Sequence, residues 1–297
     1  IATWQDMSNV SDSTKVISRA YGTLKPYNPN LLAGYLITGL SSIVALFGLA
    51  YLKRSKKTLI VLGVLFLTVF FAVFVTGSRG AYLGLFGFMG VLFLFMIYII
   101  KNYFGGFYKI KTKYKVILSV LTGFCLVVAF LIPSFRERII SIFSFRKDSS
   151  ISFRMNVYEA CYQMFLDNKF LGIGVGNNNF REIYGLYMKT GFDALGSYSV
   201  PLEIAVESGI FAFLAFFLFI LLVVIRSIRF ITYKGAHPYN RLIVLSVLLT
   251  VSAVMCHGLF DTVFFRPQIQ ILFWTYMAIF HAVTIKRAKL KQLRLLR

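Results

Sequence analysis

Seven long apolar runs dominate the chain, and none of them contains an aspartate, glutamate, lysine or arginine. They cover residues 31–52, 58–76, 81–100, 116–133, 210–225, 242–260 and 269–285. Each is close in length to the about 20 helical residues that cross the hydrocarbon core of a bilayer. The runs do not alternate as strands do, and lipid admits only helices or closed barrels. We therefore predict an all-α polytopic integral membrane protein with about seven transmembrane helices.

The segments between these runs alternate in charge. Four of them, 53–57, 101–115, 226–241 and the tail from 286, hold 19 of the 32 lysines and arginines and no acid. All 11 acidic residues lie in the other segments. Because lysine and arginine favour the cytoplasmic side, we expect the basic set inside and the acidic set outside.

This alternation divides the chain into five parts. We expect an extracytoplasmic lead-in at 1–30, four transmembrane helices within 31–133 and a large extracytoplasmic loop with short helices at 134–209. Three further transmembrane helices within 210–285 and a basic cytoplasmic tail at 286–297 complete the chain. Residue 1 is Ile1 and no signal peptide precedes the first run, so we expect the sequence to be the later part of a longer protein.

Composition agrees with a membrane protein. The chain is 58% hydrophobic and 14% charged, whereas soluble proteins are about 25% charged. A net charge of +21 would indicate nucleic acid in a soluble domain, but here the basic residues flank apolar runs, where they meet anionic membrane lipids. We expect no nucleic-acid partner. The three cysteines have neither zinc spacing nor a disulfide pattern.

The large loop has a predicted structure of its own. Ser152 is a plausible N-cap for a helix that ends near Asp167, with its apolar residues on one face. A glycine-rich turn follows at 171–177, which lacks the preceding strand and the lysine of a phosphate-binding loop. A short helix is expected at 179–189. Pro201 then starts a helix that we expect to run on into the membrane, with Glu203 and Glu207 on one face.

Three arginines near the predicted outer face are candidates for binding an anion. Arg79, Arg154 and Arg266 each present a planar, permanently charged fork that suits phosphate oxygens. Each could instead be an interfacial anchor or an ion-pair partner, as Arg266 would be for Asp261. His257, near Asp261, is either a base or a packing residue. The sequence offers no metal-ligand cluster, and we expect neither a metal nor another cofactor.

Several stretches together carry a family resemblance. They are NPNLLAGY at 28–35, SRGA at 78–81, the loop helix that begins near Arg154, LGIGVGN at 171–177 and PLEIAVESG at 201–209. In this order the chain resembles the O-antigen ligase and polymerase family of membrane proteins. The stretches 194–209 and 257–267 are most similar to a branch of that family labelled as bicarbonate transporters.

The resemblance implies a membrane glycosyltransferase. Such an enzyme moves a glycan from an undecaprenyl or other polyprenyl diphosphate to an acceptor glycan or glycolipid, at the outer face of the bacterial inner membrane. Family loop arginines bind the diphosphate, which implies that Arg79 and Arg154 do so here. The remaining residues that we expect around the substrate are Arg266, Ser78, Ser199, His257 and Asp261.

One departure from the family pattern concerns the base. The ligases carry a histidine at the position of Tyr198, which is followed here by Ser199. A base is still needed to accept the acceptor's proton, and Glu207, Glu203 and Tyr198 are the candidates. Glu207 comes first, because it lies one turn deeper towards the bilayer, where loss of water raises the pKa of a carboxyl group more; it could instead only brace the loop.

Two other functions stay open at this point. The chain could transport a small anion such as bicarbonate, or serve as a non-catalytic assembly subunit. Transporters place ionisable groups near the membrane midplane, and the seven runs hold no aspartate, glutamate, lysine or arginine. We therefore favour the enzyme, which would contribute to polysaccharide biosynthesis in the cell envelope.

Overall fold

The computed structural model describes residues 28–103 and 149–295, and these residues form helices and loops with no strand among them. The α-helices are α1 (Pro29–Leu52), α2 (Lys56–Val75), α3 (Arg79–Tyr103), α6 (Ser149–Asp167), α7 (Asn177–Tyr184), α8 (Val200–Thr232), α9 (Pro238–Gly258) and α10 (Pro267–Leu295). A short 3-10 helix, η3 (Val263–Phe265), precedes α10. The prediction of an all-α membrane protein is confirmed.

Six of these helices are long and apolar enough to cross a membrane: α1, α2, α3, α8, α9 and α10. They correspond to six of the seven predicted runs. The seventh run, 116–133, lies outside the described residues, so that part of the helix count stays a prediction. The basic tail was expected as a separate part, and the structure continues α10 through it to Leu295 without interruption.

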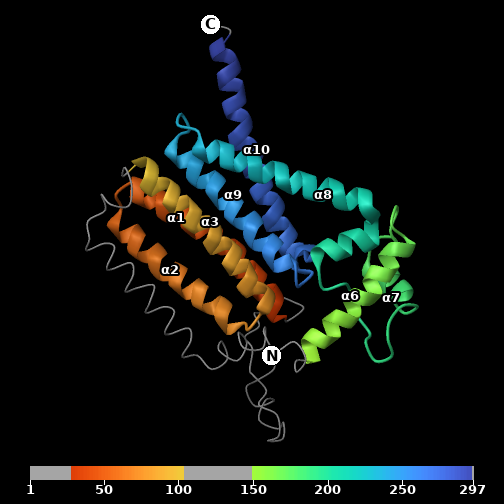
Figure 1. Cartoon of the computed structure of the whole chain (residues 1–297). Helices are drawn as coiled ribbons and strands as arrows, with labels where there is room; N and C mark the ends of the chain where they lie inside the picture. The colour runs from red at the N-terminus through yellow and green to blue at the C-terminus, as the bar shows by residue number, and fades with distance from the viewer. Residues whose placement is uncertain (1–27, 104–148, 296–297) are drawn as a thin grey trace, which may run out of the picture.

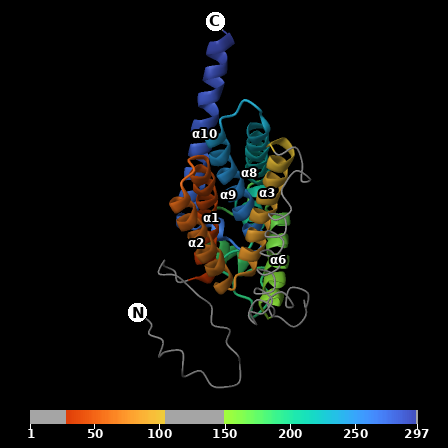
Figure 2. The same ribbon diagram turned by 90° about the vertical axis from the view of Figure 1, so that its left-hand side faces the viewer.

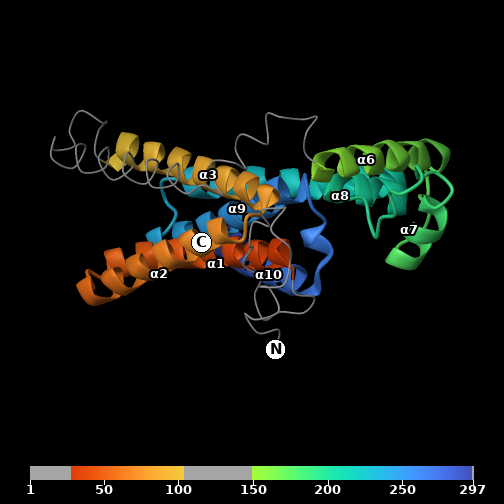
Figure 3. The same cartoon turned by 90° about the horizontal axis from the view of Figure 1, so that it is seen from below.

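Helix α9 forms the centre of the bundle. Figures 2 and 3 show it in the middle, with α3 and α8 on one side and α1, α2 and α10 on the other. Of the 18 residues that form the apolar span of α9, 72% are buried, against 11% of those in α2. Glycines bring α3 close to it, since a Cβ on Gly84 would lie 2.9 Å from the carbonyl oxygen of Ala253. Such small-residue contacts replace the hydrophobic effect, which does not act between helices in lipid.

Helices α6 and α7 and the first part of α8 form a small unit at one end of the bundle (Figure 1). It has its own apolar core, made by Val157, Cys161 and Met164 of α6 with Phe180 and Tyr184 of α7. The predicted apolar face of the loop helix and its end at Asp167 are confirmed. The predicted N-cap at Ser152 is wrong, because α6 already begins at Ser149. The second loop helix is shorter than predicted, because α7 covers Asn177–Tyr184 rather than 179–189.

The helix expected to run from Pro201 straight into the membrane is instead broken at Gly209. This residue has φ 77° and ψ −178°, a conformation that no helix contains and that side chains strongly disfavour. Residues 200–208 therefore form a short helix of their own, and the membrane part of α8 begins at Ile210. The kink lies at the edge of the molecule, beside the loop that joins α6 to α7 (Figure 1).

That loop satisfies the backbone groups that the break leaves open. The amides of Ile173 and Gly174 donate to the carbonyls of Val206 and Glu207, both at 3.0 Å, and the amide of Ile210 donates to the carbonyl of Lys169 at 2.8 Å. A backbone group buried without a partner costs about 1–3 kcal/mol, so these three bonds stabilise the break. We call residues 169–176 the clamp loop.

Two glycines let the backbones of the clamp loop and the break approach each other. A Cβ on Gly172, where φ is +72°, would lie 2.4 Å from the carbonyl oxygen of Glu207. A Cβ on Gly209 would lie 2.2 Å from that of Phe170. The glycine-rich segment thus packs against the break and bonds to it, as expected for a turn rather than for a phosphate-binding loop.

A glycine pair within the clamp loop tests this contact. Gly172→Ala and Gly176→Ala both force a side chain into a left-handed conformation, at a cost of about 1–3 kcal/mol. Only Gly172→Ala also meets the backbone of Glu207, since a Cβ on Gly176 meets nothing within 4 Å. We expect faster hydrogen exchange of the Ile173 and Gly174 amides in Gly172→Ala, and near-parent exchange in Gly176→Ala. Equal exchange in the two variants would contradict the clamp.

Candidate functional site

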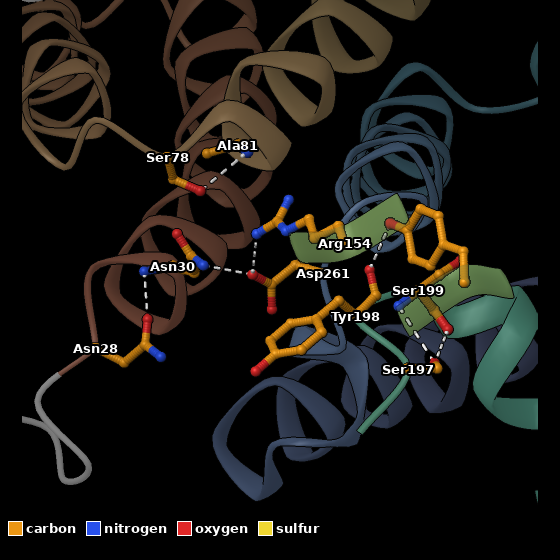
Figure 4. Close-up of polar contacts among 10 residues, drawn as sticks. Asn28, Asn30, Ser78, Ala81, Arg154, Ser197, Tyr198, Ser199 and Asp261 are labelled. Carbon is orange, nitrogen blue, oxygen red and sulfur yellow. Dashed lines mark hydrogen bonds and ion pairs between the residues drawn. The ribbon is translucent and has the colours of Figure 1, made fainter. Parts of the chain in front are cut away.

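An ion pair and a hydrogen bond on one oxygen connect the loop unit to the bundle. Nη2 of Arg154, in α6, lies 3.7 Å from Oδ2 of Asp261, which follows α9. The side-chain amide of Asn30, at the start of α1, donates a hydrogen bond to the same oxygen. The two charged side chains are 21% and 13% exposed, so water screens the pair only in part. Figure 4 shows the three side chains converging from separate elements.

Helix caps fix the starts of α1 and α3. The side chain of Asn28 accepts a hydrogen bond from the amide of Asn30 at 2.8 Å and so caps α1. The hydroxyl of Ser78 accepts one from the amide of Ala81 at 3.3 Å and caps α3 (Figure 4). Each cap satisfies a helix amide that has no partner within its helix. Ser78 is buried, and its hydrogen bond fixes the start of α3.

Tyr198 lies against Arg154. The guanidinium carbon is 5.7 Å from the centre of the tyrosine ring, and Phe153 packs edge-on against the same ring at 5.8 Å. The hydroxyl of Tyr158 donates to the carbonyl of Tyr198 at 3.1 Å. These contacts hold Tyr198 at φ 53°, a left-handed conformation that is costly for a tyrosine and is typical of functional sites.

Burial and charge set the titration of this cluster. Burial raises the pKa of Asp261, against the lowering effects of Arg154, the Asn30 hydrogen bond and Arg266. Burial and then Asp261 raise the pKa of Tyr198, with Arg154 and Arg266 acting in the opposite direction. A tyrosine whose pKa lies above its usual value stays protonated at neutral pH. Tyr198 can therefore donate a hydrogen bond here, but it is a poor base.

Arg266 lies near enough to this cluster for its charge to act on it. It directly follows η3 and precedes Pro267, which opens α10. Its charge acts on Asp261, on Tyr198 and on Glu203. The ion pair of Asp261 is made with Arg154 rather than with the sequence neighbour Arg266. Arg154 thus lies on the Tyr198 ring, and the charges of Asp261 and Arg266 also act on this tyrosine.

The two glutamates of the 200–208 helix are buried and have different partners. Glu203, 5% exposed, accepts a hydrogen bond from the amide of Ser197 at 3.1 Å, and the Ser197 hydroxyl lies 3.1 Å from the same oxygen. Glu207, 6% exposed, accepts one from the amide of Gly176 at 3.3 Å. Glu207 therefore braces the clamp loop, whereas Glu203 faces the turn that carries Tyr198 and Ser199.

Ser199 is the residue that precedes α8. It is buried, and its carbonyl accepts hydrogen bonds from the Ser197 hydroxyl at 2.8 Å and from the Glu203 amide at 2.8 Å. Figure 4 shows Ser197, Tyr198 and Ser199 as one tight turn beside Arg154. The contacts of Ser199 orient the turn and the first residues of the helix.

Arg79 and His257 lie at the same end of the bundle. Arg79 is the first residue of α3 and is half-buried. A Cβ on its neighbour Gly80 would lie 2.7 Å from Cδ2 of His257, so α3 packs directly on this ring. His257 is 1% exposed, and neither ring nitrogen has a hydrogen-bond partner among the described residues.

Sequence reasoning missed Asn30, Tyr158 and Ser197. Tyr158 lies four residues after Arg154 and so on the same helix face, a spacing that was visible in the sequence. Asn30 and Ser197 gave no comparable signal, because their partners are distant or depend on the shape of a turn. Within the described residues, no group of three histidine, cysteine, aspartate or glutamate side chains could hold a metal ion.

Comparison with known families supports the assignment that the motifs indicated. The family model described as O-antigen ligase matches residues 64–217, just over half of the 297 residues. The match contains Arg79, Arg154, Tyr198, Glu203 and Glu207. No protein of curated function matches the chain. The similarity to a branch of bicarbonate transporters has no support beyond the sequence motifs. On the strength of the family match and the six apolar helices, the chain belongs to the O-antigen ligase family, a family of membrane glycan ligases and polymerases that act on lipid-linked glycans.

Proposed function

We propose that this protein transfers a glycan from a polyprenyl diphosphate to a hydroxyl of an acceptor glycan or glycolipid, at the outer face of a bacterial cytoplasmic membrane. The observation that carries the proposal is the contact of Arg154 with Asp261 and the Tyr198 ring at one end of the bundle. This contact holds the Arg154 guanidinium between the loop unit and the membrane helices, where it could bind the diphosphate of the substrate.

The proposed reaction breaks the bond between the sugar's anomeric carbon and the diphosphate and forms one from that carbon to the acceptor oxygen. The acceptor proton passes to a base, and the polyprenyl diphosphate leaves with the bonding electrons. Negative charge grows on the diphosphate, and arginine forks stabilise such oxygens by charge-assisted hydrogen bonds. Arg154 and Arg266 carry this role, with Arg79 at the start of α3 as the third cation.

Glu203 is the base in this proposal. Its carboxylate lies on the turn that carries Tyr198 and within reach of the charge of Arg266. Glu207, the other candidate, holds the clamp loop through Gly176. Tyr198 donates a hydrogen bond, because its raised pKa keeps the phenol protonated. Ser199 and Ser78 position the backbone, and His257 packs α3 against α9.

The orientation in the membrane can be tested on two described lysines. Lys189 lies in the loop unit, whereas Lys234 lies in the basic connection between α8 and α9. With an impermeant thiol reagent on intact cells, we expect labelling of Lys189→Cys and no labelling of Lys234→Cys until the cells are opened. The reverse pattern would overturn the proposed topology.

Arg154 is tested against a second arginine of the same loop unit. We expect Arg154→Gln to lower the rate of glycan transfer by roughly 10²-fold or more, since it removes a donor to the charge that grows in the transition state. Arg154→Lys keeps the charge but not the fork, so we expect an intermediate rate. The assay is release of polyprenyl diphosphate from a lipid-linked glycan in proteoliposomes.

Arg181→Gln is the matched control. Arg181 is exposed and pairs with Asp193 at 3.5 Å on the surface of the loop unit. We expect the parent rate in this variant, because exposed pairs contribute little. A parent rate in Arg154→Gln would rule out the proposed role. Absence of any diphosphate release by the parent protein would rule out the transferase.

The pH dependence of transfer tests the link between Asn30 and Asp261. Ionised Asp261 orients Arg154 in this proposal, and the Asn30 hydrogen bond stabilises the ionised form. Asn30→Ala therefore raises the pKa of Asp261, and we expect the acidic limb of the rate profile to move to higher pH. Asn28→Ala removes the cap of α1 but no hydrogen bond to Asp261. We therefore expect the acidic limb of the rate profile of this variant to stay at the pH of the parent protein. An unmoved limb in Asn30→Ala would exclude this role of Asp261.

A further inference from the structure

The membrane part of α8 presents an apolar side that no other described helix covers. Phe211 is 66% exposed, Leu214 56% and Leu218 55%, at the three- and four-residue spacing of one helix face. These residues lie in a helix long and apolar enough to cross a bilayer. An exposed apolar face on such a helix is suited to contact with lipid.

The clamp loop continues this surface beyond the end of the helix. Phe170 stacks on Phe211 with ring centres 6.2 Å apart, and Phe170 is itself 59% exposed. Two further apolar residues of the loop, Leu171 and Val175, are 86% and 72% exposed, whereas Ile173 between them packs on the core of the loop unit. The apolar surface thus passes from a membrane helix onto a loop without a gap.

The position of this surface is fixed by the backbone. The Lys169 carbonyl accepts from the amide of Ile210, the first residue of the membrane part of α8. The Lys169 ammonium lies 5.8 Å from the centre of the Phe170 ring. A lysine above an aromatic ring at a helix end is typical of the membrane interface, where the stem lies on apolar surface and the charge meets lipid headgroups.

We propose that the clamp loop is a membrane anchor that inserts Phe170, Leu171 and Val175 into the boundary between headgroups and acyl chains of the bilayer. Lys169 contacts the lipid phosphates at the same level. The anchor sets the depth of the break at Gly209, and with it the depth of the 200–208 helix that carries Glu203. This inference stands apart from the proposed transfer reaction, because it rests on exposed apolar surface and not on the charged cluster.

Tryptophan fluorescence in lipid vesicles tests the anchor directly. The full chain, with Trp4 and Trp274 replaced by phenylalanine, receives a single tryptophan as Leu171→Trp. Leu186→Trp is the matched control, because Leu186 is 79% exposed but follows α7, where its amide donates to the carbonyl of Ile183. The vesicles contain phosphatidylcholine and phosphatidylglycerol, with bromine atoms at defined depths along the acyl chains.

We expect Leu171→Trp to be quenched most by bromines near the top of the acyl chains, as befits insertion of about 5–10 Å into the boundary region. Leu186→Trp should be quenched by iodide in the water and not by brominated lipid. Val175→Trp repeats the measurement should Leu171→Trp fail to fold. If the tryptophans at 171 and 175 respond to iodide and not to brominated lipid, the loop faces water or another protein and the anchor is excluded.

Discussion

The contact of Arg154 with Asp261 is the interaction on which the arrangement of the site depends. It joins a loop helix to the end of the central membrane helix, and Asn30 adds the first helix of the bundle on the same oxygen. Neither charge is fully hydrated, so removing one partner leaves the other in a partly buried position without compensation. The same guanidinium lies against Tyr198, which places the turn before α8. Arg154 and Asp261 together thus connect four segments that are far apart in the sequence.

A second constraint comes from the backbone. A helix that breaks close to the membrane must find other partners for its amides and carbonyls. The clamp loop supplies them, and its Gly172 and the Gly209 of the break allow the close approach. Because Glu207 also accepts a hydrogen bond from the amide of Gly176, the break, the clamp loop and Glu207 form one unit. The loop unit is therefore held to the membrane part twice, once by charge and once by backbone hydrogen bonds.

The membrane helices could be predicted from the sequence because lipid leaves an apolar run of such length almost no alternative to a helix. The apolar face of α6 followed from helical periodicity in the same way. The break at Gly209 could not be foreseen, since 201–213 has the pattern of one continuous helix and glycine alone does not end a helix. The pairing of Arg154 with Asp261 was also hidden, because residues 107 positions apart meet only through the fold. Arg266, close to Asp261 in sequence, was the more obvious partner and is not the one that the structure selects.

In the proposed reaction, Arg154 is the residue of the loop unit that binds the diphosphate of the lipid-linked glycan. A cryo-EM structure of the protein with a bound polyprenyl diphosphate glycan tests this most directly. The account predicts phosphate oxygens within about 2.7–2.9 Å of the Arg154 guanidinium, with Arg79 or Arg266 on the same diphosphate and the polyprenyl chain along the membrane helices. A diphosphate bound away from Arg154, with the pair to Asp261 unchanged, would contradict it.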